Sequence, residues 1–230
     1  MPQGAISPYL VPGFYGDALA KGRHRDIVGG RWDETGRAQM AALRAEGLAP
    51  HHRLLDIGAG ALRLGCKAVP YLDPGNYWGT DLSGLLMQRG YDLELAQKDR
   101  LSPAQLVEDS DFTFPGVPET IDYAIAFAVF THLPANHLVP ALANLYARFP
   151  QLQRLLFTVF LAPDAITAQT PYRQADGVVT HPNRAPYHVL GDDVITHCHA
   201  SGFDAERRET RLPRGQALFV AKRTAQTEQG

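Results

Sequence analysis

Glycines and acids occur in two short stretches of the sequence with a spacing that could hold a ligand. The stretch LLDIGAGALRLG, residues 54–65, places Asp56 before a loop that contains Gly58 and Gly60. Glycine lets a backbone turn tightly and approach a ligand closely, at a cost in chain entropy. A further acid, Asp81, ends the next apolar run, where a carboxylate can accept hydrogen bonds from both hydroxyls of a ribose. The pattern therefore predicts a site for a ligand that contains a ribose.

Two ligands fit this pattern, a dinucleotide and S-adenosylmethionine. The dinucleotide fingerprint is G-x-G-x-x-G, whose third glycine allows close helix packing. Here Gly58 and Gly60 are followed by Arg63, so the third glycine is absent. Asp56 stands just before the loop, where a carboxylate would repel a pyrophosphate but is compatible with a sulfonium and an ammonium group. These features favour S-adenosylmethionine.

The elements that would carry these residues alternate between strands and helices. Strands are predicted at residues 52–58, 77–83, 104–112, 121–130 and 154–162. Helices are predicted at residues 33–46, 61–72, 84–97 and 134–149. The near-continuous apolar runs of the last two strands suit a parallel sheet that is buried on both faces. The alternation predicts an α/β fold with right-handed crossovers.

The pattern changes in the last third of the chain. Residues 163–187 contain four prolines and no clear period, which predicts a long irregular connection, and such connections are usually functional or disordered. Residues 187–203 predict a helix. Residues 204–212 and 216–223 predict two strands that are joined by the short turn PRG. We expect one domain over residues 1–230, in which 163–187 is an insertion on the substrate side.

Composition excludes several classes of function. The formal net charge is −2, so no basic face points to nucleic acid or to polybasic membrane attachment. The two cysteines, Cys66 and Cys198, make neither a disulfide framework nor a metal site, and a cytoplasmic location is expected. No signal peptide is expected, and the longest apolar run is too short to span a bilayer.

The motifs resemble those of the class I S-adenosylmethionine-dependent methyltransferases. LLDIGAGALRLG is similar to their motif I, WGTDLS to their acidic strand-2 motif, and IDYAIAFAVFTHLP to their strand-4 segment. The closing stretch PYH…G…LPRGQALFVAKR resembles a bacterial branch that acts on small molecules or sugars. The resemblance covers roughly residues 29–223. It implies a Rossmann-like three-layer sandwich, with a mostly parallel seven-stranded sheet and an antiparallel last strand.

The resemblance also implies which residues bind the methionine part of the cofactor. Gly58 and Gly60 would pass under it, and Asp56 would order this loop and the ammonium group. Phe127 and Ala128 would line the cofactor after the fourth strand.

Ribose and adenine contacts are implied in the same way. Asp81 would hold the ribose, and Leu82 would pack on the adenine. Asp111 and Phe112 would meet the adenine edge, with Asp109 as the alternative to Asp111, because EDSDF permits two registers.

Candidate bases are histidines near the rim where the methyl group must point. His132 and His137 flank the start of the helix at 134–149, and His188 ends the long connection. The pKa of a histidine lies near neutrality, so His132 or His188 could accept a proton. The alternative for His132 is a hydrogen bond to a backbone group. His197 and His199 lie two apart on a helix and do not share a face, so no metal site is expected.

Substrate contacts are expected from three segments. The connection must lie above the cofactor, and at least one of its polar residues should touch the substrate: Tyr172, Arg173, His181, Arg184, Tyr187 or His188. Arg214 and Gln216 border the last hairpin, where the alternative is a solvated turn. In the irregular N-terminal arm, residues 1–32, Trp32 is a candidate lid aromatic, and simple packing is the alternative. Tyr187 and Arg214 are the preferred substrate residues.

The expected activity is methyl transfer from S-adenosylmethionine to a small polar acceptor. The first choice of acceptor is a hydroxyl of a sugar or natural product, and the second is a nitrogen of a small metabolite. A nucleotide-dependent oxidoreductase and a non-catalytic cofactor-binding partner are the alternatives from other classes. The expected partner is the small-molecule acceptor, with no nucleic acid and no membrane, and a homodimer is left open.

Overall fold

The computed structural model describes residues 7–11 and 13–224, and a mostly parallel sheet forms its centre. The strand order along the main path is β3-β2-β1-β4-β5-β10-β9. The strands are β1 (Leu54–Ile57), β2 (Tyr77–Asp81), β3 (Leu106–Glu108), β4 (Tyr123–Ala126), β5 (Arg154–Leu161), β9 (Phe203–Arg208) and β10 (Ala217–Arg223). Pairing is parallel from β3 to β5, and β10 runs antiparallel to both of its neighbours. The predicted fold class, with its antiparallel last strand, is confirmed.

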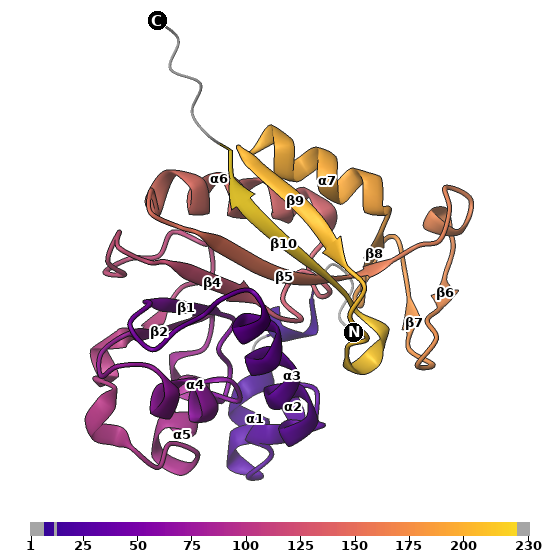
Figure 1. Ribbon diagram of the computed structural model, residues 1–230. Coiled ribbons are helices and arrows are strands. Elements are labelled where there is room, and N and C mark those ends of the chain that lie inside the picture. The colour runs from indigo at the N-terminus through magenta and orange to yellow at the C-terminus, as the bar shows by residue number, and fades with distance from the viewer. Residues whose placement is uncertain (1–6, 12, 225–230) are drawn as a thin grey trace, which may run out of the picture.

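Helices cover both faces of this sheet (Figure 1). One face carries α3 (Trp32–Ala45), α4 (Gly65–Tyr71) and α5 (Gly84–Leu93), and the other carries α6 (Leu138–Arg148) and α7 (Gly191–Ala200). Side chains of β5 alternate between two cores: Leu155 and Phe157 pack on the side of α6 and α7, and Leu156 packs on the side of α3 and α4. A strand that is buried on both faces is apolar at nearly every position, which explains the near-continuous run in the sequence; the exception inside β5 is Thr158.

The described part of the N-terminal arm is helical and not irregular. It contains a short 3-10 helix at Pro8–Leu10, followed by α1 (Phe14–Ala20) and α2 (His24–Ile27). Residues 1–6 and 12 of the predicted arm lie outside the described residues. His24 and Arg25 pair with Glu94 at 2.7 and 2.6 Å, which anchors the arm beside α5. Helices of this length are too short to show an apolar period in the sequence.

The connection at 163–187 also has more order than the sequence predicts. It forms a hairpin from β6 (Tyr172–Arg173) and β7 (Val179–Thr180), which projects from one end of the molecule (Figure 1). The next strand, β8 (His188–Val189), pairs in parallel with the end of β5. The predicted helix therefore begins at Gly191 and not at 187. Strands of two residues show no alternation that a sequence pattern could detect.

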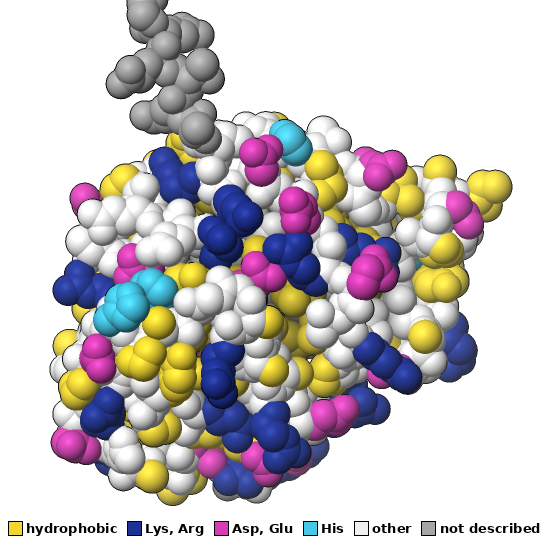
Figure 2. Space-filling view, viewed as in Figure 1, with side chains coloured by type: hydrophobic (Ala, Val, Ile, Leu, Met, Phe, Trp, Pro, Cys, Tyr) yellow, Lys and Arg dark blue, Asp and Glu magenta, His cyan; other side chains and the backbone are white. Residues whose placement is uncertain are grey.

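Charged side chains of both signs are mixed over the face seen in Figure 2, as the small net charge suggests. Within residues 7–11 and 13–224, no helix is both long and apolar enough to cross a membrane.

Candidate functional site

A cavity of about 770 Å³ opens at the carboxyl ends of the parallel strands. Gly58 and Gly60 follow β1, Asp81 ends β2 and Phe127 follows β4, and all four residues line the cavity. In an open α/β sheet this is the edge at which ligands bind. The volume suits a nucleoside together with a second small molecule.

Asp81 connects the two motifs that the sequence singled out. Its buried carboxylate accepts hydrogen bonds of 2.9 Å from the backbone N–H of Gly60 and from that of Ser83. Burial raises the pKa of Asp81 to about 6, although these two N–H donors act in the opposite direction. The carboxylate therefore holds the glycine loop and the start of α5 in one arrangement while it borders the cavity.

Gly58 and Gly60 occupy positions that other residues would fill badly. Their φ angles are +71° and +55°, in the left-handed region that favours glycine. A Cβ on Gly58 would lie 2.5 Å from Val129, and one on Gly60 would lie 2.7 Å from Val28. The loop is thus closely packed between the end of β4 and the N-terminal arm.

Asp56 does not line the cavity. Its carboxylate accepts a 2.7 Å hydrogen bond from the hydroxyl of Tyr77, and burial raises the pKa of Asp56 to about 7. The implied contact with an ammonium group, and the expected repulsion of a pyrophosphate, are therefore not supported by this geometry. The carboxylate is turned toward Tyr77 on β2, where it supports the strand that precedes the loop.

Arg63 also lines the cavity. In the sequence it is notable only because it occupies the position of the third glycine in the dinucleotide fingerprint. Its side chain is largely buried, and Nη1 donates to the carbonyl of Val28 at 2.7 Å. Its Nε is buried and has no hydrogen-bond partner among the described residues. Burial lowers the pKa of Arg63 to about 10, so the group stays cationic at neutral pH. The signal in the sequence is a cation at position 63 within the otherwise apolar stretch ALRLG.

The end of β3 separates the two acids between which the sequence left a choice. Asp109 accepts backbone N–H bonds from Asp111, Thr113 and Phe114, so its carboxylate holds the loop together. Asp111 is exposed at the cavity wall, and among the described residues its carboxylate accepts a side-chain hydrogen bond only from the neighbouring hydroxyl of Ser110. Asp111 is therefore the acid that is free for a ligand. Leu82 and Phe112 also line the cavity, as the resemblance implies.

The end of β4 continues into a short hydrogen-bonded chain. Ala128 lines the cavity with a φ of +62°, and its N–H donates to Oγ1 of Thr158 at 2.8 Å. That hydroxyl donates in turn to Oε1 of Gln216 at 2.6 Å. Non-glycine residues in this backbone region are sparse and tend to occur at functional sites.

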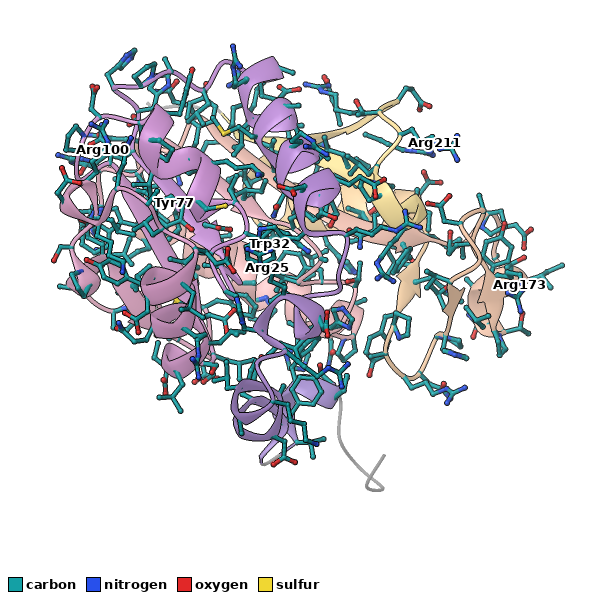
Figure 3. The ribbon with its side chains drawn as sticks, turned by 90° about the horizontal axis from the view of Figure 1, so that it is seen from below. Arg25, Trp32, Tyr77, Arg100, Arg173 and Arg211 are labelled. Atoms are coloured by element: carbon teal, nitrogen blue, oxygen red, sulfur yellow. The ribbon has the colours of Figure 1, made fainter. Side chains whose placement is uncertain are left out.

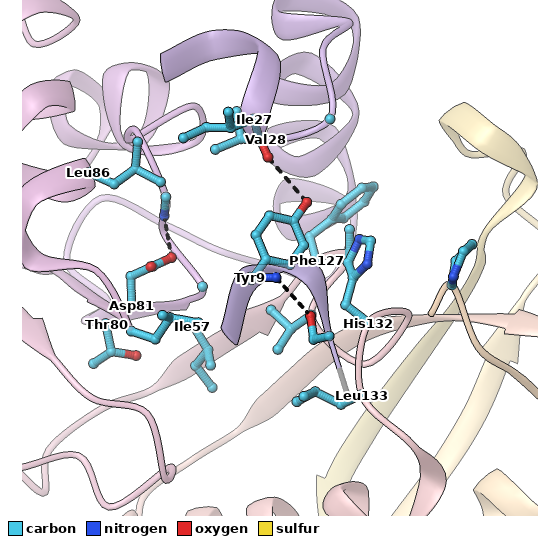
Figure 4. A pocket seen from close by; sticks show the side chains of 18 of the residues that line it. Tyr9, Ile27, Val28, Ile57, Thr80, Asp81, Leu86, Phe127, His132 and Leu133 are labelled. Atoms are coloured by element: carbon cyan, nitrogen blue, oxygen red, sulfur yellow. Dashed lines mark hydrogen bonds between the residues drawn. The ribbon is translucent and has the colours of Figure 1, made fainter. Parts of the chain in front are cut away.

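His132 lies on the opposite side of the cavity from Asp81, with the ring of Tyr9 between them in the view of Figure 4. Its Nδ1 is buried and has no partner among the described residues, so the predicted backbone bond is not observed at this atom. Burial, and secondly the charge of Arg214, lower the pKa of His132 to about 4. His132 is therefore a neutral imidazole with a free nitrogen. His137 lines the same cavity.

His188 and Tyr187 are not brought to the cavity, which corrects two predictions. Nδ1 of His188 bonds Oγ1 of Thr180 at 2.8 Å, and Nε2 faces the carbonyl of Ala168 at 3.4 Å, so neither ring nitrogen is available as a base. Tyr187 is buried, and its N–H donates to Thr131. For His188 the cause is that the chain pairs with the end of β5 here, so the ring contacts Thr180 and Ala168 of the connection.

The other candidates of the connection also lie outside the cavity lining: Tyr172, Arg173, His181 and Arg184. Figure 3 shows Arg173 at the outer end of the molecule, away from Trp32. The connection instead contributes Val178 and Pro186. Arg214 and Gln216 do line the cavity.

Trp32 packs and does not form the lid. The guanidinium of Arg25 lies 5.1 Å from the centre of its ring, and the two side chains lie together in Figure 3. The arm reaches the cavity with Tyr9 and Tyr15 instead. Within the described ranges there is no group of three His, Cys, Asp or Glu side chains that could hold a metal ion.

Comparisons with known proteins agree on the fold. No protein-family model matches the sequence, and a search of curated proteins finds no match. A magnesium protoporphyrin IX methyltransferase from Synechocystis PCC 6803, solved with S-adenosylmethionine, superposes with a TM-score of 0.62 at 17% identity, over 96% of this chain and 100% of that chain. A 1,6-didemethyltoxoflavin-N1-methyltransferase from Burkholderia thailandensis, solved with S-adenosylhomocysteine, gives 0.60 at 18% identity, over 94% and 91%.

An O-methyltransferase family protein from Burkholderia thailandensis gives a TM-score of 0.60 at 12% identity, over 92% of this chain and 63% of that chain. Identities this low show the fold. The chain therefore has the fold of the class I S-adenosylmethionine-dependent methyltransferases, which confirms the fold that the resemblance implies.

Proposed function

We propose that this protein transfers a methyl group from S-adenosylmethionine to an oxygen of a small polar acceptor. The observation that carries the proposal is the pairing of Asp81 with the glycine loop at the mouth of the parallel sheet. A carboxylate that accepts hydrogen bonds and a backbone loop that can approach a ligand closely lie at this edge. Together they suit a ribose and the chain attached to it. The similar proteins solved with S-adenosylmethionine or S-adenosylhomocysteine support the same cofactor.

The residues that line the cavity fit the parts of this cofactor. Asp81 would accept the ribose hydroxyls, and Asp111 and Phe112 would border the adenine. Arg63 has a buried Nε without a partner, and a methionine carboxylate is the kind of group that would satisfy it. When bound, the cofactor supplies an electrophilic methyl group on a sulfonium. The sulfur leaves as a neutral thioether, so its departure needs no acid catalysis.

Proton removal from the acceptor falls to His132 in this proposal. The free Nδ1 can accept a hydroxyl proton if the ring carries its own proton on Nε2. The low pKa of His132 keeps this nitrogen unprotonated at physiological pH in the free enzyme, so the base is ready when the acceptor binds. The walls around it contain Leu133 and Phe160, which exclude water from the reacting atoms.

Two alternatives from other classes are less well supported. A dinucleotide-dependent oxidoreductase would have the all-parallel strand order 3-2-1-4-5-6, whereas here β10 lies antiparallel between β5 and β9. A non-catalytic cofactor-binding partner would need no base, and the free nitrogen of His132 argues against it. An amine acceptor would need only to be unprotonated, so a dedicated base favours O-methylation over N-methylation.

The cofactor is tested first by thermal unfolding. S-adenosylhomocysteine should raise the melting temperature by mass action, and NAD should not. A shift with NAD alone would replace the proposed function by the oxidoreductase.

Turnover is then tested with a deproteinised cell extract and an equal mixture of S-adenosylmethionine and its trideuteromethyl form. Methylated products appear as paired masses in liquid chromatography–mass spectrometry. The Asp81→Ala variant serves as the matched blank. Cofactor binding without any paired product would favour the non-catalytic partner.

A further inference from the structure

We infer that the methyl acceptor is a small anion. Its body is largely apolar, and it presents a carboxylate or similar oxyanion to Arg214. This inference rests on the proposed function. The evidence is the distribution of charge around the cavity, the state of the Arg214 side chain, and an unused donor on Gln216.

Acidic side chains line only one half of the cavity. Asp81, Asp109 and Asp111 are the only carboxylates in the described lining, and they follow β2 and β3. That half is the one assigned to ribose and adenine. The half around His132 therefore contains no described carboxylate that could recognise an ammonium group. A cationic acceptor would leave its charge without a partner there, which is costly away from water.

Arg214 supplies positive charge to this half. It lies in the turn between β9 and β10, and one of its Nη atoms donates to the backbone carbonyl of Gly29. It forms no ion pair with any residue that the structure describes, unlike Arg208 on the same hairpin, which pairs with Glu46 and Glu206. A guanidinium offers donors in a planar fork, so the remaining ones can bind an oxyanion.

The backbone of Arg214 is itself unusual. Its φ is +65°, a region where glycine or asparagine would be expected in a turn. Gly215 follows with a φ of +70°, so the turn does not lack a glycine. An arginine is held in this conformation at the cavity wall, where an unpaired cation has a use.

Gln216 contributes a second donor beside this charge. Oγ1 of Thr158 accepts the N–H of Ala128, and its hydroxyl donates to Oε1 of Gln216, so the oxygen of the amide is the atom that contacts Thr158. The Nε2 of Gln216 is thus a donor, and it has no partner among the described residues. Arginine and glutamine together offer only donors to the acceptor.

Most of the remaining wall of this half is apolar and lies beside the polar side chain of His137: Leu133, Pro140, Phe160, Val178, Pro186 and Pro213. A sugar would leave many hydroxyls unpaired against such a surface. A ring or short hydrocarbon that carries one oxyanion is the better fit.

The test compares three fragments of similar size on protein saturated with S-adenosylhomocysteine: benzoate, benzamide and benzylamine. Dissociation constants are measured by NMR chemical-shift titration. We expect benzoate to bind at least about tenfold more tightly than benzamide, and benzylamine to bind more weakly than either. Arg214→Gln should abolish the advantage of benzoate, and Gln216→Leu should weaken benzoate in the same direction.

The matched control is Arg211→Gln, because Arg211 is exposed on the same hairpin but does not line the cavity. It should keep the preference for benzoate. An affinity for S-adenosylhomocysteine equal to that of the wild-type protein shows that the fold of a variant is intact. The inference is overturned if benzoate does not bind, if benzylamine binds as tightly, or if the preference survives Arg214→Gln. Failure of the wild-type protein to bind S-adenosylhomocysteine would instead overturn the proposed function.

Discussion

The carboxylate of Asp81 accepts a 2.9 Å hydrogen bond from the backbone N–H of Gly60, so the acid at the end of β2 and the loop after β1 form one unit. Two motifs that are separate in the sequence therefore depend on each other. A change at Asp81 that removes both carboxylate oxygens would release the loop as well as remove the proposed contact with the ribose. Predictions about this residue must separate these two effects.

Replacement of Asp81 should weaken cofactor binding more than it weakens the fold. Asp81→Asn keeps one oxygen for Gly60 but loses the charge and one acceptor atom. We expect a loss of about 1.5–3 kcal/mol in affinity for S-adenosylhomocysteine, the range for hydrogen bonds to charged groups. Isothermal titration calorimetry measures the loss. Asp73→Asn, at an exposed position, is the control, and unchanged affinity in Asp81→Asn would remove Asp81 from the ribose site.

Cofactor affinity should depend on pH through the same carboxylate. The pKa of Asp81 is raised to about 6, so the acceptor form is lost as the pH falls through that value. Affinity for S-adenosylhomocysteine should be constant from pH 7 to 8 and fall below about pH 6. Calorimetry across this range gives the profile. In Asp81→Asn the profile should be flat, and an identical inflection in that variant would assign it to another group.

Arg63 should recognise the methionine carboxylate of the cofactor. Arg63→Met removes the guanidinium but keeps an apolar stem against the wall. Affinity for S-adenosylhomocysteine should fall by about tenfold or more, because a charge-assisted contact is lost. The matched ligand is 5′-methylthioadenosine, which lacks the carboxylate and should bind wild type and variant alike. Equal losses for both ligands would mean that Arg63 acts only by holding the arm through Val28.

Much of the fold could be predicted because β4 and β5 carry continuous apolar runs and the intervening helices are amphipathic. The three elements of two residues, β6, β7 and β8, could not, since they have no period. β6 pairs with β7, and β8 pairs with the end of β5 through a contact that is long-range in the sequence. That pairing also turns His188 away from the cavity, which is why its predicted role was wrong.

The cofactor half of the site was easier to predict than the acceptor half. Asp81 and the glycines occupy strand ends, and topology places strand ends together. Tyr9, Tyr15 and Val178 reach the cavity from segments whose packing no local pattern reveals. Asp56 differs from the implied role, because the resemblance implies a contact with the ammonium group, whereas the side chain bonds Tyr77.

Asp56 should make the protein less stable as the pH rises. Its folded-state pKa is raised to about 7 against 3.8 for the free side chain, so the folded protein binds the extra proton between these values. Its contribution to stability is complete below about pH 4 and is lost as the pH rises through 7, with a slope of at most about 1.4 kcal/mol per pH unit. Asp56→Asn mimics the protonated form and still accepts from Tyr77. Urea unfolding at several pH values should show a shallower dependence in Asp56→Asn, and a parallel profile would contradict the buried, protonated state.

His132 should affect the methyl-transfer step and not cofactor binding. His132→Gln should lower kcat for the acceptor found in the extract by about 10²–10⁴-fold, the usual contribution of a general base, and leave S-adenosylhomocysteine affinity unchanged.

In the free enzyme burial and the Arg214 charge keep the pKa of His132 near 4, so kcat/KM at saturating cofactor should show no inflection from this group between pH 6 and 8. A bound acceptor anion would offset the Arg214 charge and raise the pKa of His132. The kcat profile should therefore inflect at a higher pH than the kcat/KM profile, because kcat reports the complex. Arg214→Gln should bring the two profiles together, and a wild-type kcat profile without such an inflection, or full activity in His132→Gln, would exclude His132 as the base.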